Sequence, residues 1–102
     1  MSNDLLSKDM ETYIVVIQQA ESNFGAYSPD VLGCVATGDT VEETVANMRE
    51  ALHFHLESMM DDGETIPVGK GLSNYINDDE LIAEPGDFIM LMAVPLPQQQ
   101  PA

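Results

Sequence analysis

The hydrophobic positions in the first third of the chain fall into three short runs, separated by polar residues, proline and glycine. The first run is rich in β-branched and aromatic residues and is too short for an uncapped helix, so it predicts a strand. The second run follows a polar turn and is close enough to pair with the first as a hairpin. Pro29 and Asp30 interrupt the chain before the third run, which Gly38 ends. The predicted strands are residues 12–20, 24–28 and 32–37.

The pattern then changes to that of an amphipathic helix. Its hydrophobic residues recur at steps of three and four, which places them on one face of a helix. Thr40 is expected to be the N-cap, with Glu43 completing a capping box. Gly63 is well placed as the left-handed residue beyond the C-terminus. The residues of the predicted hydrophobic face are Val41, Val45, Met48, Leu52, Leu56 and Met59.

The last part of the chain is less regular. Residues 64–71 have the composition of a loop, and residues 72–83 predict a short helix or an irregular lid. Residues 88–94 (FIMLMAV) form a nearly continuous hydrophobic run, which predicts a strand buried on both faces. The predicted organisation is a flexible arm over 1–11, one domain over 12–94, and a disordered tail over 95–102.

The order β-β-β-α-β predicts an α+β fold. A three-stranded antiparallel meander and a returning strand would pack on one long helix as a two-layer sandwich. A single helix covers only one face of the sheet, so the apolar second face of strand 88–94 would form an exposed patch. We therefore expect the protein to associate with itself as a homo-oligomer.

The charge of the chain restricts its partners. Its 102 residues include 18 Asp plus Glu against 3 Lys plus Arg, for a formal charge of −15. The three cations, Lys8, Arg49 and Lys70, are scattered, so direct binding to nucleic acid or to an anionic membrane is not expected. A basic protein partner would be attracted by this field.

Composition also indicates the compartment. The apolar share of 44% is enough for one folded domain. No apolar run approaches the roughly 20 residues of a membrane span, and the first ten residues lack the features of a secretory signal. The single cysteine, Cys34, excludes an intramolecular disulfide. These features predict a cytoplasmic protein.

No group of residues predicts catalysis, a metal or a cofactor. His53 and His55 are two residues apart on the helix and point to different sides, whereas a zinc pair needs a spacing of three or four. We expect His55 at the edge of the hydrophobic face, and His53 exposed near Glu57. Cys34 is expected to be an inert, buried thiol. The acidic groups at 42–43, 61–62 and 78–80 have the character of solvated charge, and the glycines do not have phosphate-loop spacing.

The stretch from Tyr27 to Glu43, YSPDVLGCVATGDTVEE, resembles the signature of HicB-like proteins. In that family a strand with the approximate pattern Y-x-P-D-L-P-G-C is followed by G-D-T-x-E-E-A and an amphipathic helix. The similarity extends over about residues 12–94. The departures are Val31-Leu32, where the family has Leu-Pro, and Thr44, where it has Ala.

The resemblance implies a partly reduced RNase H-like fold and the function of an antitoxin. HicB antitoxins bind HicA, a small basic toxin that cleaves mRNA, and longer members add a DNA-binding module. The chain stops eight residues after Val94, so operator binding is not expected of it. Nuclease activity is not expected either, because Asp30, Asp39 and Glu43 do not suggest a two-metal centre. Pro29, Asp30, Gly33 and Gly38 are expected to shape turns.

Three hypotheses remain. The first is an antitoxin-type protein that neutralises a basic HicA-type toxin. The second is a solitary interaction or regulatory module that has no toxin. The third is a residual metal-dependent nuclease, which a magnesium or manganese titration would test.

Overall fold

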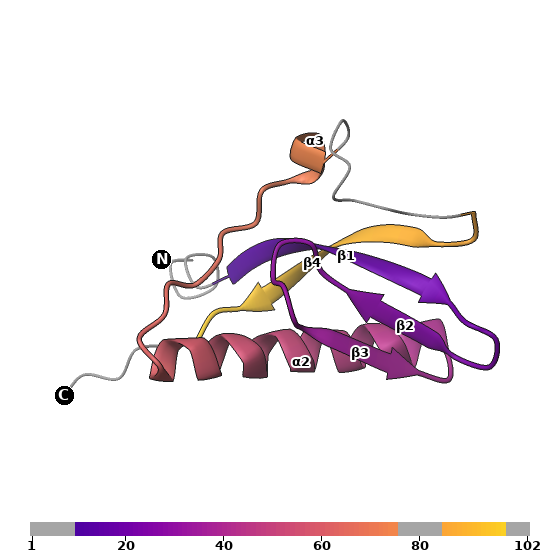
Figure 1. Ribbon diagram of the computed structural model, residues 1–102, viewed down its shortest axis with the longest axis horizontal. Helices are drawn as coiled ribbons and strands as arrows, with labels where there is room; N and C mark the ends of the chain where they lie inside the picture. The colour runs from indigo at the N-terminus through magenta and orange to yellow at the C-terminus, as the bar shows by residue number, and fades with distance from the viewer. Residues whose placement is uncertain (1–9, 76–84, 98–102) are drawn as a thin grey trace, which may run out of the picture.

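The computed structural model describes residues 10–75 and 85–97. In this part of the chain a four-stranded sheet packs with one face against a single long helix (Figure 1). The sheet order is β3-β2-β1-β4, and all neighbouring strands are antiparallel. This arrangement confirms the predicted α+β fold, with a meander of three strands and a fourth strand that returns to pair with the first. The elements are β1 (Met10–Gln19), β2 (Phe24–Tyr27), β3 (Val35–Gly38), α2 (Val41–Asp61), α3 (Leu72–Tyr75) and β4 (Phe88–Pro95).

The third strand begins later than predicted. Residues 32–34 precede β3 and belong to a turn, in which the Cys34 N–H donates to the Val31 carbonyl at 3.4 Å. Gly33 has a φ of 87°, a left-handed conformation that a strand residue does not adopt. Leu32 is consequently 81% exposed. The prediction of a strand over 32–37 is therefore wrong at its start.

The outer strands extend further than predicted. β1 and β4 pair from Met10 with Pro95 to Ile17 with Phe88. The prediction that residues 10–11 belong to the arm and Pro95 to the tail is therefore wrong, because these residues lie in β1 and β4 of the sheet. Residues 1–9 and 98–102 lie outside the described residues.

The helix begins and ends where its capping residues predict. Thr40 accepts the Glu43 N–H at 3.0 Å, and the Glu43 carboxylate accepts the Asp39 N–H at 2.7 Å. At the other end Gly63 has a φ of 76°, and the Glu64 N–H donates to the Met59 carbonyl at 2.9 Å. These contacts satisfy backbone groups that a helix end leaves unpaired.

The core lies between α2 and the sheet. Met48, Leu52 and Leu56 are completely buried, which confirms the predicted hydrophobic face. Burying one such side chain contributes about 1.5–3 kcal/mol, so this layer supplies much of the stability of the domain. The sheet residues of the core are Tyr13, Val15, Ile17, Ala26, Met92 and Val94.

β4 is buried on one face only, so the prediction that both of its faces are buried is wrong. Met92 and Val94 face α2 and are fully buried, whereas Ile89 and Leu91 are exposed on the other face. Side chains alternate along a strand, and β4 lies at an edge of the described sheet. An apolar patch is therefore exposed on the face away from α2, as expected.

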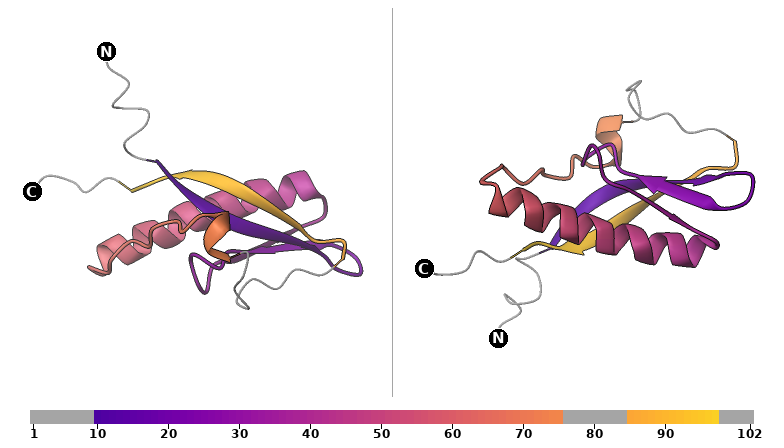
Figure 2. Two further views of the ribbon diagram at one scale, coloured as in Figure 1. Left: turned by 90° about the horizontal axis from the view of Figure 1, so that it is seen from above. Right: turned by 60° about the horizontal axis from the view of Figure 1, so that its bottom comes forward.

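The chain after α2 covers the centre of that second face. It passes from the end of α2 to the opposite side of the sheet, where α3 lies (Figures 1 and 2). Ile14 and Val16 alternate with the core residues of β1, yet are no more than 1% exposed. The predicted short helix or lid over 72–83 is a four-residue helix, α3, in its first part. The rest of that range lies outside the described residues. We refer to residues 66–75 as the strap.

Candidate protein-binding site

Asp30 fastens the strap to the sheet. The residue follows β2 in the Pro29-Asp30 turn, and its side chain is buried. One carboxylate oxygen accepts the Ile14 N–H at 2.8 Å. The other accepts the Tyr75 hydroxyl at 2.6 Å and the Lys70 N–H at 3.3 Å. Both oxygens are therefore engaged in holding the fold, which agrees with the structural role expected of Asp30.

A second set of contacts joins the strap to β1. The Tyr13 hydroxyl donates to the Pro67 carbonyl at 2.7 Å, and the Glu11 carboxylate accepts the Gly69 N–H at 2.8 Å. Burial, followed by the negative charges of Glu11 and Asp30, raises the pKa of Tyr13 to about 12. The phenol therefore stays protonated as a hydrogen-bond donor at neutral pH. Sequence reasoning missed these contacts, because each joins residues more than fifty positions apart.

Gly38 is required where β3 meets the helix. A Cβ atom added at Gly38 would lie 2.6 Å from the Thr44 hydroxyl oxygen. That hydroxyl donates to the Thr40 carbonyl at 2.7 Å and is buried against the sheet. Thr44, one of the departures from the family pattern, is thus accommodated by an internal hydrogen bond.

A hollow lies on the strap side of the sheet, beside Asp30. It has a volume of about 450 Å³ and is lined by Tyr27, Pro29, Asp30, Leu32 and Lys70. The Lys70 ammonium lies 5.9 Å from the centre of the Tyr75 ring. Because the carboxylate oxygens of Asp30 already accept hydrogen bonds from the protein, this hollow does not present a free base for proton transfer.

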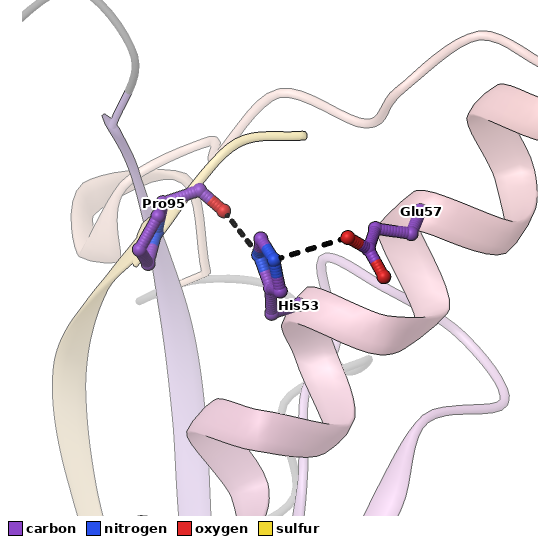
Figure 3. Close-up of polar contacts among 3 residues, drawn as sticks. All are labelled: His53, Glu57 and Pro95. Atoms are coloured by element: carbon purple, nitrogen blue, oxygen red, sulfur yellow. Dashed lines mark hydrogen bonds and ion pairs between the residues drawn. The ribbon is translucent and has the colours of Figure 1, made fainter. Parts of the chain in front are cut away.

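His53 connects α2 to the end of β4 (Figure 3). Its Nδ1 lies 2.8 Å from the Pro95 carbonyl, and its Nε2 lies 3.4 Å from a Glu57 carboxylate oxygen. Since a carbonyl only accepts, Nδ1 carries the proton in this contact. The expected proximity to Glu57 is confirmed, but His53 is half-buried and its contact with Pro95 was not anticipated. His55 is half-buried, as expected for the edge of the hydrophobic face.

The other candidate groups do not converge. Cys34 is buried just before β3, and burial raises the pKa of its thiol. Asp39 and Glu43 take part in the N-terminal cap of α2, while Asp30 holds the strap. Within residues 10–75 and 85–97, no three or more His, Cys, Asp or Glu side chains gather closely enough to hold a metal ion. Asp78, Asp79 and Glu80 lie outside these ranges.

The surface offers features for binding a protein. Eight acidic residues lie in α2 and its flanks, where Arg49 is the one cation between positions 39 and 64. Two exposed apolar sites accompany them, namely Phe54 on α2 and the outer face of β4, which we define as Ile89 and Leu91. None of the helices in the described residues is both long and apolar enough to cross a membrane. The eight acidic residues are Asp39, Glu42, Glu43, Glu50, Glu57, Asp61, Asp62 and Glu64.

This fold is that of the HicB antitoxins. The chain is similar to the N-terminal domain of antitoxin HicB from Burkholderia pseudomallei, with 22% identity and a TM-score of 0.66. That match covers 83% of this chain and 99% of the other. A chain in the solved HicA3 and HicB3 toxin–antitoxin complex is 30% identical, with a TM-score of 0.64. This second match covers 85% of the present chain and 99% of its counterpart.

The sequence comparisons identify the family. The model of the HicB-like antitoxin of bacterial toxin–antitoxin systems matches residues 13–96, so the chain belongs to that family. A 14.9 kDa protein of Haemophilus phage HP1, from the rep-hol intergenic region, is 37% identical over 68 residues. The match covers 67% of this chain and 51% of the phage protein, so the chain spans about half the length of that relative.

Proposed function

We propose that this chain is an antitoxin-type protein that binds and neutralises a basic, mRNA-cleaving toxin of the HicA type. The observation that carries this proposal is the family match over residues 13–96. It is supported by the similarity, at 30% identity, to a chain of a solved toxin–antitoxin complex. The charge of −15 suits a basic partner.

Neutralisation requires the antitoxin to compete with RNA. A toxin that cleaves mRNA must bind phosphates with Lys and Arg side chains, and the carboxylates of this domain would occupy the same cations. Electrostatic attraction speeds the encounter, whereas buried apolar contacts supply most of the affinity. The domain itself acts by binding, without catalysis, in the cytoplasm where mRNA is found.

The direct test examines the reading frames next to the one that encodes this chain and uses any short basic protein found there. We expect the two purified proteins to form a complex, and RNA cleavage by the toxin to stop at equimolar antitoxin. The association rate should fall steeply as salt increases. Absence of binding, or absence of a neighbouring toxin gene, would contradict the proposal and favour a solitary interaction module. Metal-dependent RNA cleavage by this chain alone would contradict its non-enzymatic role.

We further propose that the protein forms homo-oligomers through the outer face of β4. This strand lies at an edge of the described sheet, and residues 88–95 contain no charged side chain. Pairing of two such edges would satisfy unpaired backbone groups and cover Leu91 and Ile89. Light scattering at micromolar concentration should give a mass above that of the monomer, and Leu91→Glu should reduce it. A single monomeric peak for the wild-type protein would refute this proposal.

A further inference from the structure

Phe54 occupies a position on α2 that the fold does not explain. Its side chain is 71% exposed. At about 100° per residue, it lies about 200° around the helix from both Leu52 and Leu56, which are fully buried. Phe54 therefore points almost directly away from the core. A phenyl ring there buries little of its own surface on folding and is not a strong helix former.

The surroundings of Phe54 form a shallow hollow whose lining includes one carboxylate, that of Glu50. The hollow has a volume of about 500 Å³ and is lined by Asn47, Glu50, Ala51 and Phe54. The Asn47 amide donates to the Thr37 carbonyl of β3 at 2.8 Å, which holds this side of the hollow in place. Because its walls come from a well-packed helix, the hollow is formed before any partner arrives.

The carboxylates on the same side of α2 as Phe54 have few cationic neighbours. Glu50 lies one helical turn before Phe54, and Glu57 and Asp61 follow at spacings of three and seven residues. In the described part of the chain, the ion pair found on this helix joins Glu57 to His53, and neither Glu50 nor Asp61 pairs with Lys or Arg. Their mutual repulsion makes a cationic partner more favourable. We call Asn47, Glu50, Phe54, Glu57 and Asp61 the Phe54 face.

We propose that the Phe54 face is the surface on which the basic toxin docks. A guanidinium or ammonium group of the toxin would stack on the Phe54 ring, while Glu50 and Glu57 accept hydrogen bonds from it. Aromatic rings attract cations through their quadrupole, and arginine combines this contact with hydrogen bonds to a carboxylate. The inference rests on the proposed function and names the surface that performs it.

Charge distinguishes this occupant from the others. A second copy of the chain would place carboxylates against carboxylates, which is unfavourable without intervening cations. A nucleic acid would be repelled through its phosphates. A purely apolar peptide would desolvate the carboxylates beside the ring without pairing them. A basic protein surface supplies cations that both stack on the Phe54 ring and pair with the carboxylates beside it.

The experiment measures toxin binding to the full chain and to matched variants. Phe54→Ala should weaken the affinity about tenfold or more, mainly through a faster dissociation rate, as expected for a central aromatic anchor. Phe54→Leu keeps an apolar side chain but loses the ring, and should also weaken binding. Glu50→Gln should chiefly lower the association rate and reduce its salt dependence.

The controls use residues of similar exposure elsewhere on the surface. Val68 on the strap is 70% exposed, and Glu21 is exposed between β1 and β2. Val68→Ala and Glu21→Gln should bind within about twofold of the wild-type protein. Unchanged circular dichroism and thermal unfolding would show that Phe54→Ala remains folded.

The outcomes separate this inference from the function on which it rests. If the wild-type chain binds the toxin and Phe54→Ala binds equally well, the Phe54 face is not the docking surface, while the antitoxin function stands. If the controls weaken binding as much as Phe54→Ala, the inference fails as well. If the wild-type chain does not bind the toxin, both proposals are overturned. A selective loss in the Phe54 and Glu50 variants would support both.

Discussion

Replacing Asp30 with alanine tests whether the strap is held mainly by one buried carboxylate. The substitution removes the acceptor for the Ile14 N–H at 2.8 Å, the Tyr75 hydroxyl at 2.6 Å and the Lys70 N–H at 3.3 Å. Ile14 and Tyr75 are each 1% exposed, so water cannot readily replace the lost acceptor. The variant would take the charged acceptor away from two buried donors, the Ile14 N–H and the Tyr75 hydroxyl.

The expected cost follows from those two donors. A hydrogen bond to a charged group contributes about 1.5–3 kcal/mol, and a buried donor left unpaired costs about 1–3 kcal/mol. The contact with Lys70 is longer and lies in a partly buried site, so it adds little. We expect Asp30→Ala to lower the free energy of unfolding by about 3–4 kcal/mol, out of a total of about 5–15 kcal/mol for a domain of ordinary stability.

Urea denaturation followed by circular dichroism measures this difference. Asp30→Asn should be intermediate, because it keeps one carbonyl acceptor but turns an amide toward a donor. Glu21→Ala, in the exposed β1–β2 turn, should change stability by no more than about 0.5 kcal/mol. Hydrogen exchange at the Ile14 amide should accelerate in the alanine variant more than exchange in the middle of α2. A loss of less than about 1 kcal/mol for Asp30→Ala would refute the reasoning.

Three further predictions concern other contacts of the fold. Folding raises the pKa of Tyr13 from 10.0 to about 12. The protonated phenol therefore contributes fully to the free energy of unfolding below pH 10, and this contribution is lost as the pH rises toward 12. This amounts to about 2–3 kcal/mol. Tyr13 should titrate late by near-ultraviolet absorbance, and Tyr13→Phe should reduce the late step by the signal of one tyrosine. Gly69→Ala should destabilise by about 2 kcal/mol or more, since the new Cβ would lie 1.8 Å from the Thr12 carbonyl oxygen. Gly25→Ala, with 3.8 Å of space, is its matched control in urea unfolding, and equal effects would contradict the clash. Thr40→Ala should cost about 1 kcal/mol by removing the N-cap, whereas Thr40→Ser should retain most of that stability in thermal unfolding.

The elements that the sequence predicted well are those with local signals. The helix has a capping threonine, a hydrophobic face at helical spacing and a glycine at its end, and all three act within one or two turns. The hairpin of β1 and β2 depends on a short polar turn, which is equally local. The sequence predicted that a fourth strand returns to the sheet, but not which strand it pairs with; in the structure β4 pairs with β1.

The predictions failed where burial depends on distant parts of the chain. A continuous hydrophobic run such as Phe88 to Val94 cannot show whether a second layer covers its other face. In this fold Ile14 and Val16 are buried at the centre of the sheet, on the side where the chain after α2 runs (Figure 1), whereas Leu91 is exposed at the sheet edge. The strap itself is held by contacts across more than forty residues, and its composition is only that of a loop.

The candidate site was also hard to predict, because the role of each acidic residue depends on distant parts of the chain. A count of 18 acidic residues does not tell which of them are used inside the fold. Asp30 accepts the Lys70 N–H and Glu11 accepts the Gly69 N–H, both from the strap. Glu50 and Asp61, by contrast, are exposed and without a cation in the described residues. The position of Phe54 opposite the core could have been found by placing the helix on a wheel, because it is the one aromatic residue of α2.

Because some carboxylates are exposed on α2 while others accept hydrogen bonds within the fold, added salt should affect folding and toxin binding differently. The exposed carboxylates of α2 repel one another in the folded domain, so added salt should stabilise the free protein by screening them. The same screening should weaken the complex with a basic toxin, because it reduces attraction across the interface. The carboxylates of Asp30 and Glu11 accept backbone hydrogen bonds, which depend on short-range geometry and are little affected by salt. If the exposed charges serve recognition, salt must therefore act with opposite signs on folding and on binding. Charges that merely kept the protein soluble would give the first effect without the second.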